Sequence, residues 1–174
     1  MEQGEREETN PASSLYHPTK TNKWRKMEER EDGMNDHPIL LAEDNPDDVM
    51  LTRRVFEKAG IQNRIVVARD GVEALDYLFG VGDYAGRDTD FMPKLVLLDL
   101  AMPRLNGVDV LRRIRASMRT KALPVLLLAG SEELNVLNDH GLAADGYVRK
   151  PLDFIQLSDM ERQLGFRWQV KANA

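Results

Sequence analysis

Four charged side chains stand at the ends of apolar runs in the sequence, and their types suit phosphate and metal chemistry. Glu43 and Asp44 follow one run, Asp99 ends a second, and Lys150 follows a third. A packed core does not require charged groups at such positions. Carboxylates that gather with one lysine are typical of a site for a divalent cation and a phosphoryl group. The sequence therefore predicts such a site, if the fold brings these run ends together.

Apolar runs alternate with helical patterns from residue 37 onward. Strands are expected at residues 39–42, 64–68, 95–98, 124–128 and 147–149, with a helix after each. Near-continuous apolar strands that alternate with helices indicate an α/β fold, a doubly wound five-stranded parallel sheet with helices on both faces. The carboxyl ends of parallel strands share one edge of such a sheet, and ligands bind there. This fold class places the four charged residues in one crevice.

The first and last helices have clear core faces in the sequence. Asn45 is a good N-cap and Pro46 fits the first helical position. The residues expected to face the core from the first helix are Val49, Leu51, Val55, Phe56 and Ala59. Those expected to face it from the last helix are Phe154, Leu157, Met160 and Leu164. The fourth helix begins with Ser131 as its cap, and the polar run 138–141 interrupts it.

Composition limits the classes of protein to consider. The 174 residues include 42% hydrophobic ones, enough for one core, and carry a formal charge of −5. This charge gives no reason to expect nucleic-acid binding, and no apolar run approaches the length of a membrane span. The lack of cysteine excludes thiolate metal sites and suits the cytoplasm. We expect a disordered polar extension at 1–36, one domain at 37–165 and a short tail at 166–174.

Five spaced elements together resemble the receiver domain of bacterial two-component response regulators. They are Glu43-Asp44, Asp99, Met102-Pro103, Gly107 and Lys150-Pro151. The resemblance covers residues 37–165 and implies a flavodoxin-like strand order, 2-1-3-4-5. The finer details resemble the single-domain regulators that serve bacterial phytochromes. These details lie in residues 42–48, in residues 69–75 and in the long loop around 82–86.

The resemblance implies a role for each site residue. Asp99 would accept a phosphoryl group from the phosphohistidine of a sensor histidine kinase, with a phytochrome among the candidate kinases. Asp44, Asp99 and the backbone carbonyl of Ala101 would bind Mg²⁺, and Glu43 would act through a water. Lys150 would contact the phosphoryl group, and Pro151, after a cis peptide bond, would direct this lysine into the crevice. The chain would then be a signalling protein, with at most slow loss of its own phosphate.

The chain departs from the family at the end of the fourth strand. Receivers carry Thr or Ser there, and the matching residue here is Ala129. Tyr147 matches the aromatic residue that responds to that hydroxyl in the family. Ser131 is a weaker candidate for a substitute hydroxyl than for a helix cap. This departure motivates an alternative function, a pseudo-receiver that binds partners with weak or absent dependence on phosphate.

Output is expected to be protein contact, because little sequence follows the last helix. Related regulators dimerise through the fourth helix, fifth strand and fifth helix, and Ile155, Phe166, Trp168 and Val170 would suit such a homodimer face. Trp168 has a second interpretation, in which it folds back over the core. A third function, a Mg²⁺ phosphohydrolase with an aspartyl nucleophile, is disfavoured. Such enzymes place a second Asp two residues after the nucleophile, where this chain has Ala101.

Overall fold

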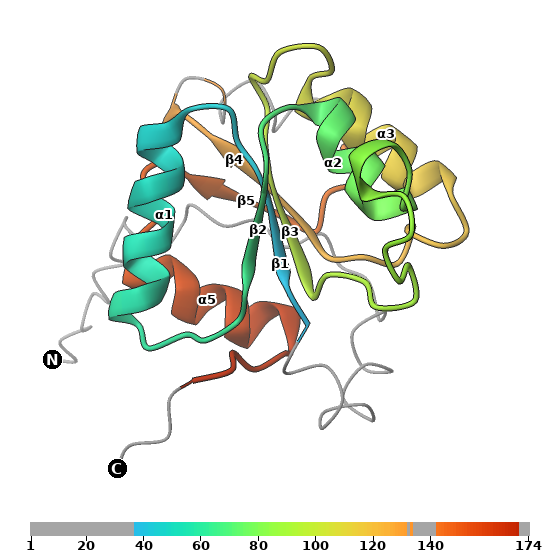
Figure 1. Ribbon diagram of the computed structural model, residues 1–174. Coiled ribbons are helices and arrows are strands. Elements are labelled where there is room, and N and C mark those ends of the chain that lie inside the picture. Colours follow the sequence, from blue (N-terminus) through green and yellow to red (C-terminus); the bar gives the residue numbers. More distant parts are fainter. Residues whose placement is uncertain (1–36, 132, 134–141, 171–174) are drawn as a thin grey trace, which may run out of the picture.

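A parallel sheet forms the centre of the computed structural model, which describes residues 37–131, 133 and 142–170. Among these residues the sheet has five strands in the order β2-β1-β3-β4-β5 (Figure 1). The strands are β1 (Ile39–Ala42), β2 (Ile65–Ala68), β3 (Leu95–Asp99), β4 (Val125–Ala129) and β5 (Gly146–Arg149). All paired neighbours run parallel. The predicted fold class and strand order are confirmed.

Helices cover both faces of this sheet. Figure 1 shows α1 and α5 on one side of the strands and α2 and α3 on the other. Their bounds are α1 (Pro46–Lys58), α2 (Gly71–Phe79), α3 (Gly107–Ala116) and α5 (Phe154–Leu164), with a short 3₁₀ turn, η4 (Gly82–Tyr84), after α2. Most of the predicted fourth helix after Ser131 lies outside the described residues.

Alternation along the strands divides the core into two clusters. In β1, Leu40 and Ala42 pack with the side chains of α2 and α3, whereas Ile39 and Leu41 pack with those of α1 and α5. Successive side chains of a strand point to opposite faces, so every residue of a central strand is buried. This burial explains why the strands read as continuous apolar runs. It also leaves the strand ends as the places where charged groups reach solvent.

Local capping fixes where the helices begin beside those strand ends. The Asn45 side chain accepts a hydrogen bond from the backbone N–H of Asp47 at 2.9 Å, and Pro46 occupies the first helical position, as predicted. Asp153 and Gln156 form a reciprocal capping box at the start of α5. These caps hold the first turns of α1 and α5 at the edge where β1 and β5 end.

The structure corrects two residues of the predicted helix faces. Leu51 in α1 is 41% exposed, and Thr52 takes the buried position beside it. Phe154, at the first position of α5, is 60% exposed, whereas Leu157, Met160 and Leu164 face the core as predicted. Both errors come from extending an apolar stripe past its limit, because the helical spacing alone does not show where the sheet ends.

The segment after α5 returns to the core. Trp168 is buried at 7% exposure, and its ring meets Phe56 edge-on at 5.3 Å between centroids. Val170 then forms an antiparallel bridge with Ile61. The second interpretation of Trp168 is therefore confirmed, and this residue is removed from the proposed dimer face. Within the described ranges, no helix combines the length and apolar character needed to cross a membrane.

Candidate functional site

Three carboxylates gather at the carboxyl edge of the sheet. One oxygen from each of Glu43, Asp44 and Asp99 lies within 4.8 Å of the other two. Glu43 and Asp99 are buried, at 1% and 4% exposure, whereas Asp44 is exposed at the mouth of the site. β1 and β3 are neighbours in the sheet, so these acids meet although more than fifty residues separate them. The structure thus brings together the acids that the sequence predicted.

Lys150 is the cation of this site. Its Nζ lies 2.6 Å from Glu43 Oε2, 3.1 Å from Asp99 Oδ1 and 3.2 Å from Asp48 Oδ2. The lysine follows β5 at the same edge of the sheet, and the Lys150–Pro151 peptide bond is cis, as the resemblance implied. The ammonium thus lies within ion-pair distance of three carboxylates and donates a hydrogen bond to Asp48 Oδ2 at 3.2 Å.

For both Glu43 and Lys150, burial and the neighbouring charges shift the pKa in opposite directions. Burial raises the pKa of Glu43, and hydrogen bonds from Lys150 and from the Asn45 backbone oppose that shift. Burial lowers the pKa of Lys150, but its hydrogen bond to Glu43 and the charge of Asp99 outweigh burial and hold that pKa well above its usual value. Lys150 is therefore charged throughout the physiological range, and the cluster retains a surplus of acidic groups.

Gly107 lets the backbone close tightly around Asp99. A Cβ at this position would lie 2.2 Å from the Asp99 carbonyl oxygen, so a larger residue would displace the site backbone. The Gly107 N–H donates to the Leu100 carbonyl at 3.0 Å, which fastens the start of α3 to the end of β3. Met102 is buried at 7% exposure in the turn between them, and Ala101 is exposed beside the acids.

The position where receivers carry a hydroxyl is closed and apolar here. Ala129 is fully buried, and its carbonyl accepts the backbone N–H of Lys150 at 2.9 Å. Tyr147, 7% exposed, belongs to the same core cluster, and burial raises its pKa. Ser131 is exposed. Ala129 therefore offers no side-chain hydroxyl at the end of β4.

Sequence reasoning missed Asp48 as a member of this site. The sequence assigned Asp48 no role at the site, yet its carboxylate reaches Lys150. The signal was its spacing, because Asp48 follows Asp44 by one helical turn. Such spacing also occurs on solvated helix faces, so the contact itself was not predictable.

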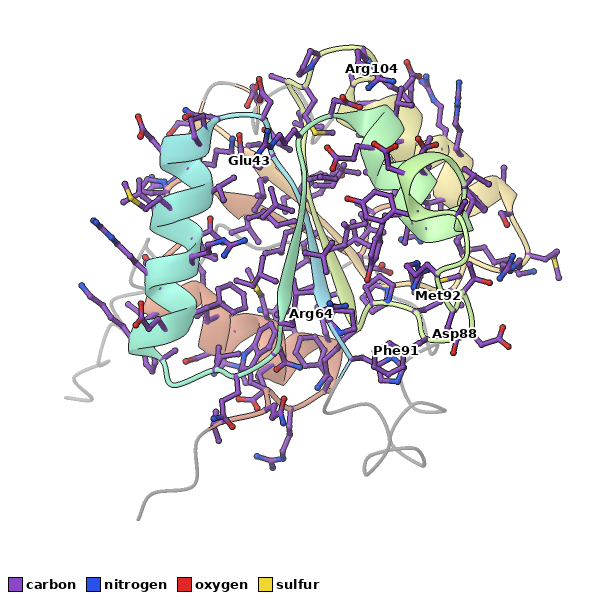
Figure 2. The ribbon with its side chains drawn as sticks, viewed as in Figure 1. Glu43, Arg64, Asp88, Phe91, Met92 and Arg104 are labelled. Carbon is purple, nitrogen blue, oxygen red and sulfur yellow. The ribbon has the colours of Figure 1, made fainter. Side chains whose placement is uncertain are left out.

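A cleft of about 840 Å³ extends from the acids across the ends of β1 and β2. Tyr84 and Arg104 lie on its lining, and Figure 2 shows Glu43 and Arg104 at the same end of the sheet. Arg104 pairs with Asp70 at 2.8 Å, and the Tyr84 hydroxyl donates to Glu73 at 2.9 Å. These pairs fix the far wall of the cleft, leaving the approach to the acids open.

The donor set fits a magnesium ion. Mg²⁺ prefers a few carboxylates together with retained waters, and Asp44 is exposed enough to allow such waters. Lys150 pairs with Asp99 through Oδ1 at 3.1 Å. The carboxylates outnumber the single ammonium, so a divalent cation would relieve their mutual repulsion.

Comparison with known proteins identifies the family. The family model described as the response regulator receiver domain matches residues 39–161. The chain belongs to the response regulator receiver family. It is 37% identical over 131 residues to the probable methanogenesis regulatory protein FilR2 of Methanothrix harundinacea, spanning 75% of this chain and 82% of FilR2. Receiver domains of this family are signalling modules rather than classical enzymes.

Two further response regulators are also similar, one of them a bacteriophytochrome response regulator. The structure of the bacteriophytochrome response regulator AtBRR matches with a TM-score of 0.72 and 39% identity, covering 79% of this chain and 98% of AtBRR. Response regulator Rcp1 of Synechocystis is 30% identical over 75% of this chain and 87% of its own length. The Mn²⁺-bound form of Rcp1 matches with a TM-score of 0.62 and 28% identity, covering 78% of this chain and 99% of that one. The predicted likeness to phytochrome-associated receivers is confirmed.

Proposed function

We propose that this receiver accepts a phosphoryl group on Asp99 from the phosphohistidine of a sensor histidine kinase of the phytochrome type, and signals through protein contacts. The observation that carries the proposal is the gathering of Glu43, Asp44, Asp99 and Lys150 at one edge of the sheet. The likeness to bacteriophytochrome response regulators supports the choice of kinase.

Each side chain has a distinct task in the proposed transfer. An Asp99 carboxylate oxygen attacks phosphorus, the bond from phosphorus to the histidine nitrogen breaks, and the electron pair remains on the imidazole. Lys150 contacts a phosphoryl oxygen through the ammonium that now pairs with Asp99. Asp44, Asp99 and the Ala101 carbonyl are proposed to hold Mg²⁺, with Glu43 acting through a water. When bound, the ion neutralises charge on the transferring group.

A pseudo-receiver differs from the proposed receiver in its conformational response to phosphorylation. Phosphoryl transfer alone does not separate the two functions. Ala129 lacks the hydroxyl that would bind the new phosphoryl group, and it is fully buried. A hydrogen bond to a charged group contributes about 1.5–3 kcal/mol, comparable to the coupling energy of a typical switch. We therefore propose that transfer is intact and that its conformational response is weak.

The test is phosphorylation of the full chain by acetyl phosphate, followed by intact-mass measurement. The native chain gains an acid-stable, base-labile phosphate in the presence of Mg²⁺ and none in EDTA. Asp99→Asn gains none. Asp47→Asn removes a charge from the exposed first turn of α1 and gains phosphate like the native chain. Equal phosphorylation of native and Asp99→Asn chains would overturn the proposal.

A kinase test then addresses the donor. A bacteriophytochrome-type histidine kinase, autophosphorylated and freed of ATP, is mixed with the native chain. Its phosphate moves to the native chain within minutes and does not move to Asp99→Asn. Transfer from an unrelated chemotaxis-type kinase at the same rate would contradict the phytochrome assignment and leave the role of Asp99 standing.

A further inference from the structure

The Lys150 ammonium is held by one more carboxylate than the proposed chemistry uses. Glu43 follows β1 and Asp99 ends β3, whereas Asp48 approaches from the first turn of α1. Its side chain is 33% exposed, against 1% for Glu43 and 5% for Asp99. Asp48 is not among the acids whose oxygens lie close enough to share a metal ion.

The first turn of α1 is a rigid support for this carboxylate. The Asn45 cap and Pro46 at the first helical position fix the backbone there, and the cap ties Asp47 at 2.9 Å. Lys150, by contrast, carries its charge on a flexible four-carbon stem, which costs entropy to hold in one place. A fixed carboxylate lowers that cost by restricting where the ammonium rests.

We propose that Asp48 is a positioning residue that holds the Lys150 ammonium at the edge of the site where the phosphoryl group arrives. This inference rests on the proposed function. The contact to Asp99 Oδ1 must be exchanged for a phosphoryl oxygen when Asp99 is phosphorylated, because that carboxylate is then part of an acyl phosphate. Asp48 and Glu43 keep the ammonium in place during the exchange. Lys150 thus changes one partner of three instead of searching from solvent.

The chain offers a matched control in the adjacent acid. Asp47 and Asp48 both lie in the first turn of α1. Replacing either one by alanine therefore removes one negative charge from the same helix end. Only Asp48 reaches Lys150. A difference in fluoroberyllate affinity between Asp48→Ala and Asp47→Ala therefore measures the contact of Asp48 with the Lys150 ammonium. A change common to both variants measures the loss of one negative charge at the start of α1.

The experiment titrates the full chain first with Mn²⁺ and then, at saturating Mn²⁺, with fluoroberyllate, which mimics a phosphoryl group on Asp99. Relative to Asp47→Ala, we expect Asp48→Ala to bind fluoroberyllate about fivefold more weakly, the loss due to a partly exposed charge-assisted contact. Asp48→Asn keeps an acceptor without the charge and falls between them, and Asp48→Glu recovers most of the affinity. Mn²⁺ affinity differs by less than about twofold between the two alanine variants, because Asp48 is not a ligand.

A second measurement follows the lysine without any metal. The Cε methylene of Lys150, labelled with ¹³C, is expected to become more mobile in Asp48→Ala than in Asp47→Ala. Equal fluoroberyllate affinities in the two alanine variants would overturn the inference, and so would tighter binding by Asp48→Ala, which would make Asp48 a competitor for the lysine. Failure of the native chain to bind fluoroberyllate would instead overturn the proposed function.

Discussion

Two lysines lie at opposite ends of the same sheet, Lys94 buried and Lys150 partly exposed, and their surroundings differ in kind. Lys150 lies at the carboxyl ends of the strands among three carboxylates. Lys94 precedes β3 at the other end, is 2% exposed, and donates to the backbone carbonyl of Arg167. Its ammonium also lies 5.1 Å from the centre of the Phe166 ring. One lysine faces a cluster of carboxylates, and the other contacts the segment that follows α5.

Their pKa values shift in opposite directions for this reason. Burial lowers the pKa of Lys94, and the charge of Glu161 only partly opposes that shift. Burial also lowers the pKa of Lys150, but the adjacent carboxylates reverse that shift. The comparison teaches that burial alone does not mark a functional lysine in this fold. The number of acids within contact distance separates the two.

The end of the sheet around Lys94 is held by contacts between distant parts of the chain. Figure 2 shows Phe91 and Met92 at this end, away from Glu43. The His37 ring hydrogen-bonds the Met92 carbonyl at 2.6 Å. Asn63 donates to the His37 carbonyl at 3.0 Å and accepts the backbone N–H of Gln169 at 2.8 Å. These contacts join the start and the end of the domain and include no carboxylate cluster among the described residues.

The largest effect is expected from Trp168→Ala, which affects only this structural end. Trp168 packs edge-on against Phe56 and Phe166, and its ring N–H donates to the Leu157 carbonyl at 3.2 Å. Removing the ring leaves a cavity and should lower the free energy of unfolding by about 3–4 kcal/mol. Urea unfolding measures the loss. Mn²⁺ affinity of the folded variant should match the native value, and a changed affinity would mean that the two ends are coupled.

Replacing each lysine by methionine tests the comparison directly. Lys150→Met should slow phosphotransfer about 100-fold, the usual cost of losing one preorganised donor to a transition-state oxygen. Lys94→Met should leave the transfer rate within about twofold of the native rate, since its ammonium does not face the acids. Rates are measured with acetyl phosphate at saturating Mg²⁺. Similar slowing in both variants would contradict the division of the molecule into two ends.

The sequence predicted those features of the two sheet ends that depend on neighbouring residues, and it missed those that depend on long side chains or distant contacts. The strands and the acids at their ends were predictable, because a buried parallel strand is a continuous apolar run and its carboxyl end is fixed by topology. The Asn45 cap was equally local. The partner of Asp48 and the burial of Lys94 were not predictable, because both depend on where a long side chain comes to rest. The position of Trp168 depends on a chain reversal after Gly165, whose φ of 65° ends α5.

Ala129→Thr is expected to strengthen the response to phosphorylation at the carboxyl end of the sheet. Its cost in stability should be smaller than that of Trp168→Ala. Ala129 is fully buried, so the added atoms should lower the free energy of unfolding by about 1 kcal/mol through overpacking. The new hydroxyl should also strengthen the response of the protein to fluoroberyllate. That response is measured as the change in self-association on adding fluoroberyllate with Mg²⁺. If the native chain already responds as strongly as Ala129→Thr, the interpretation of Ala129 as a weakened switch is wrong.

The smallest expected effect is a difference in alkaline pH dependence between native chain and Lys94→Met. The folded chain releases the Lys94 proton at lower pH than the unfolded chain, whose lysines titrate near 10.5. Below the lowered pKa both states are protonated and the cost of burying the charge is fully present. Between the lowered pKa and 10.5 the unfolded state binds more protons, so rising pH increases the free energy of unfolding through Lys94.

Other groups act in the opposite direction, which makes the difference between the two curves the quantity to measure. The raised pKa of Lys150 stabilises the folded state below 10.5, and this contribution is lost above it. Tyr84, whose pKa burial and Glu73 raise to about 12, loses its contribution above pH 10. Both are unchanged in Lys94→Met and cancel in the difference. Urea unfolding measured as the pH rises toward 10.5 should therefore show the native chain gaining stability relative to Lys94→Met. Parallel curves would mean that the contacts of Lys94 offset its burial, and that the two lysines differ less than their surroundings indicate.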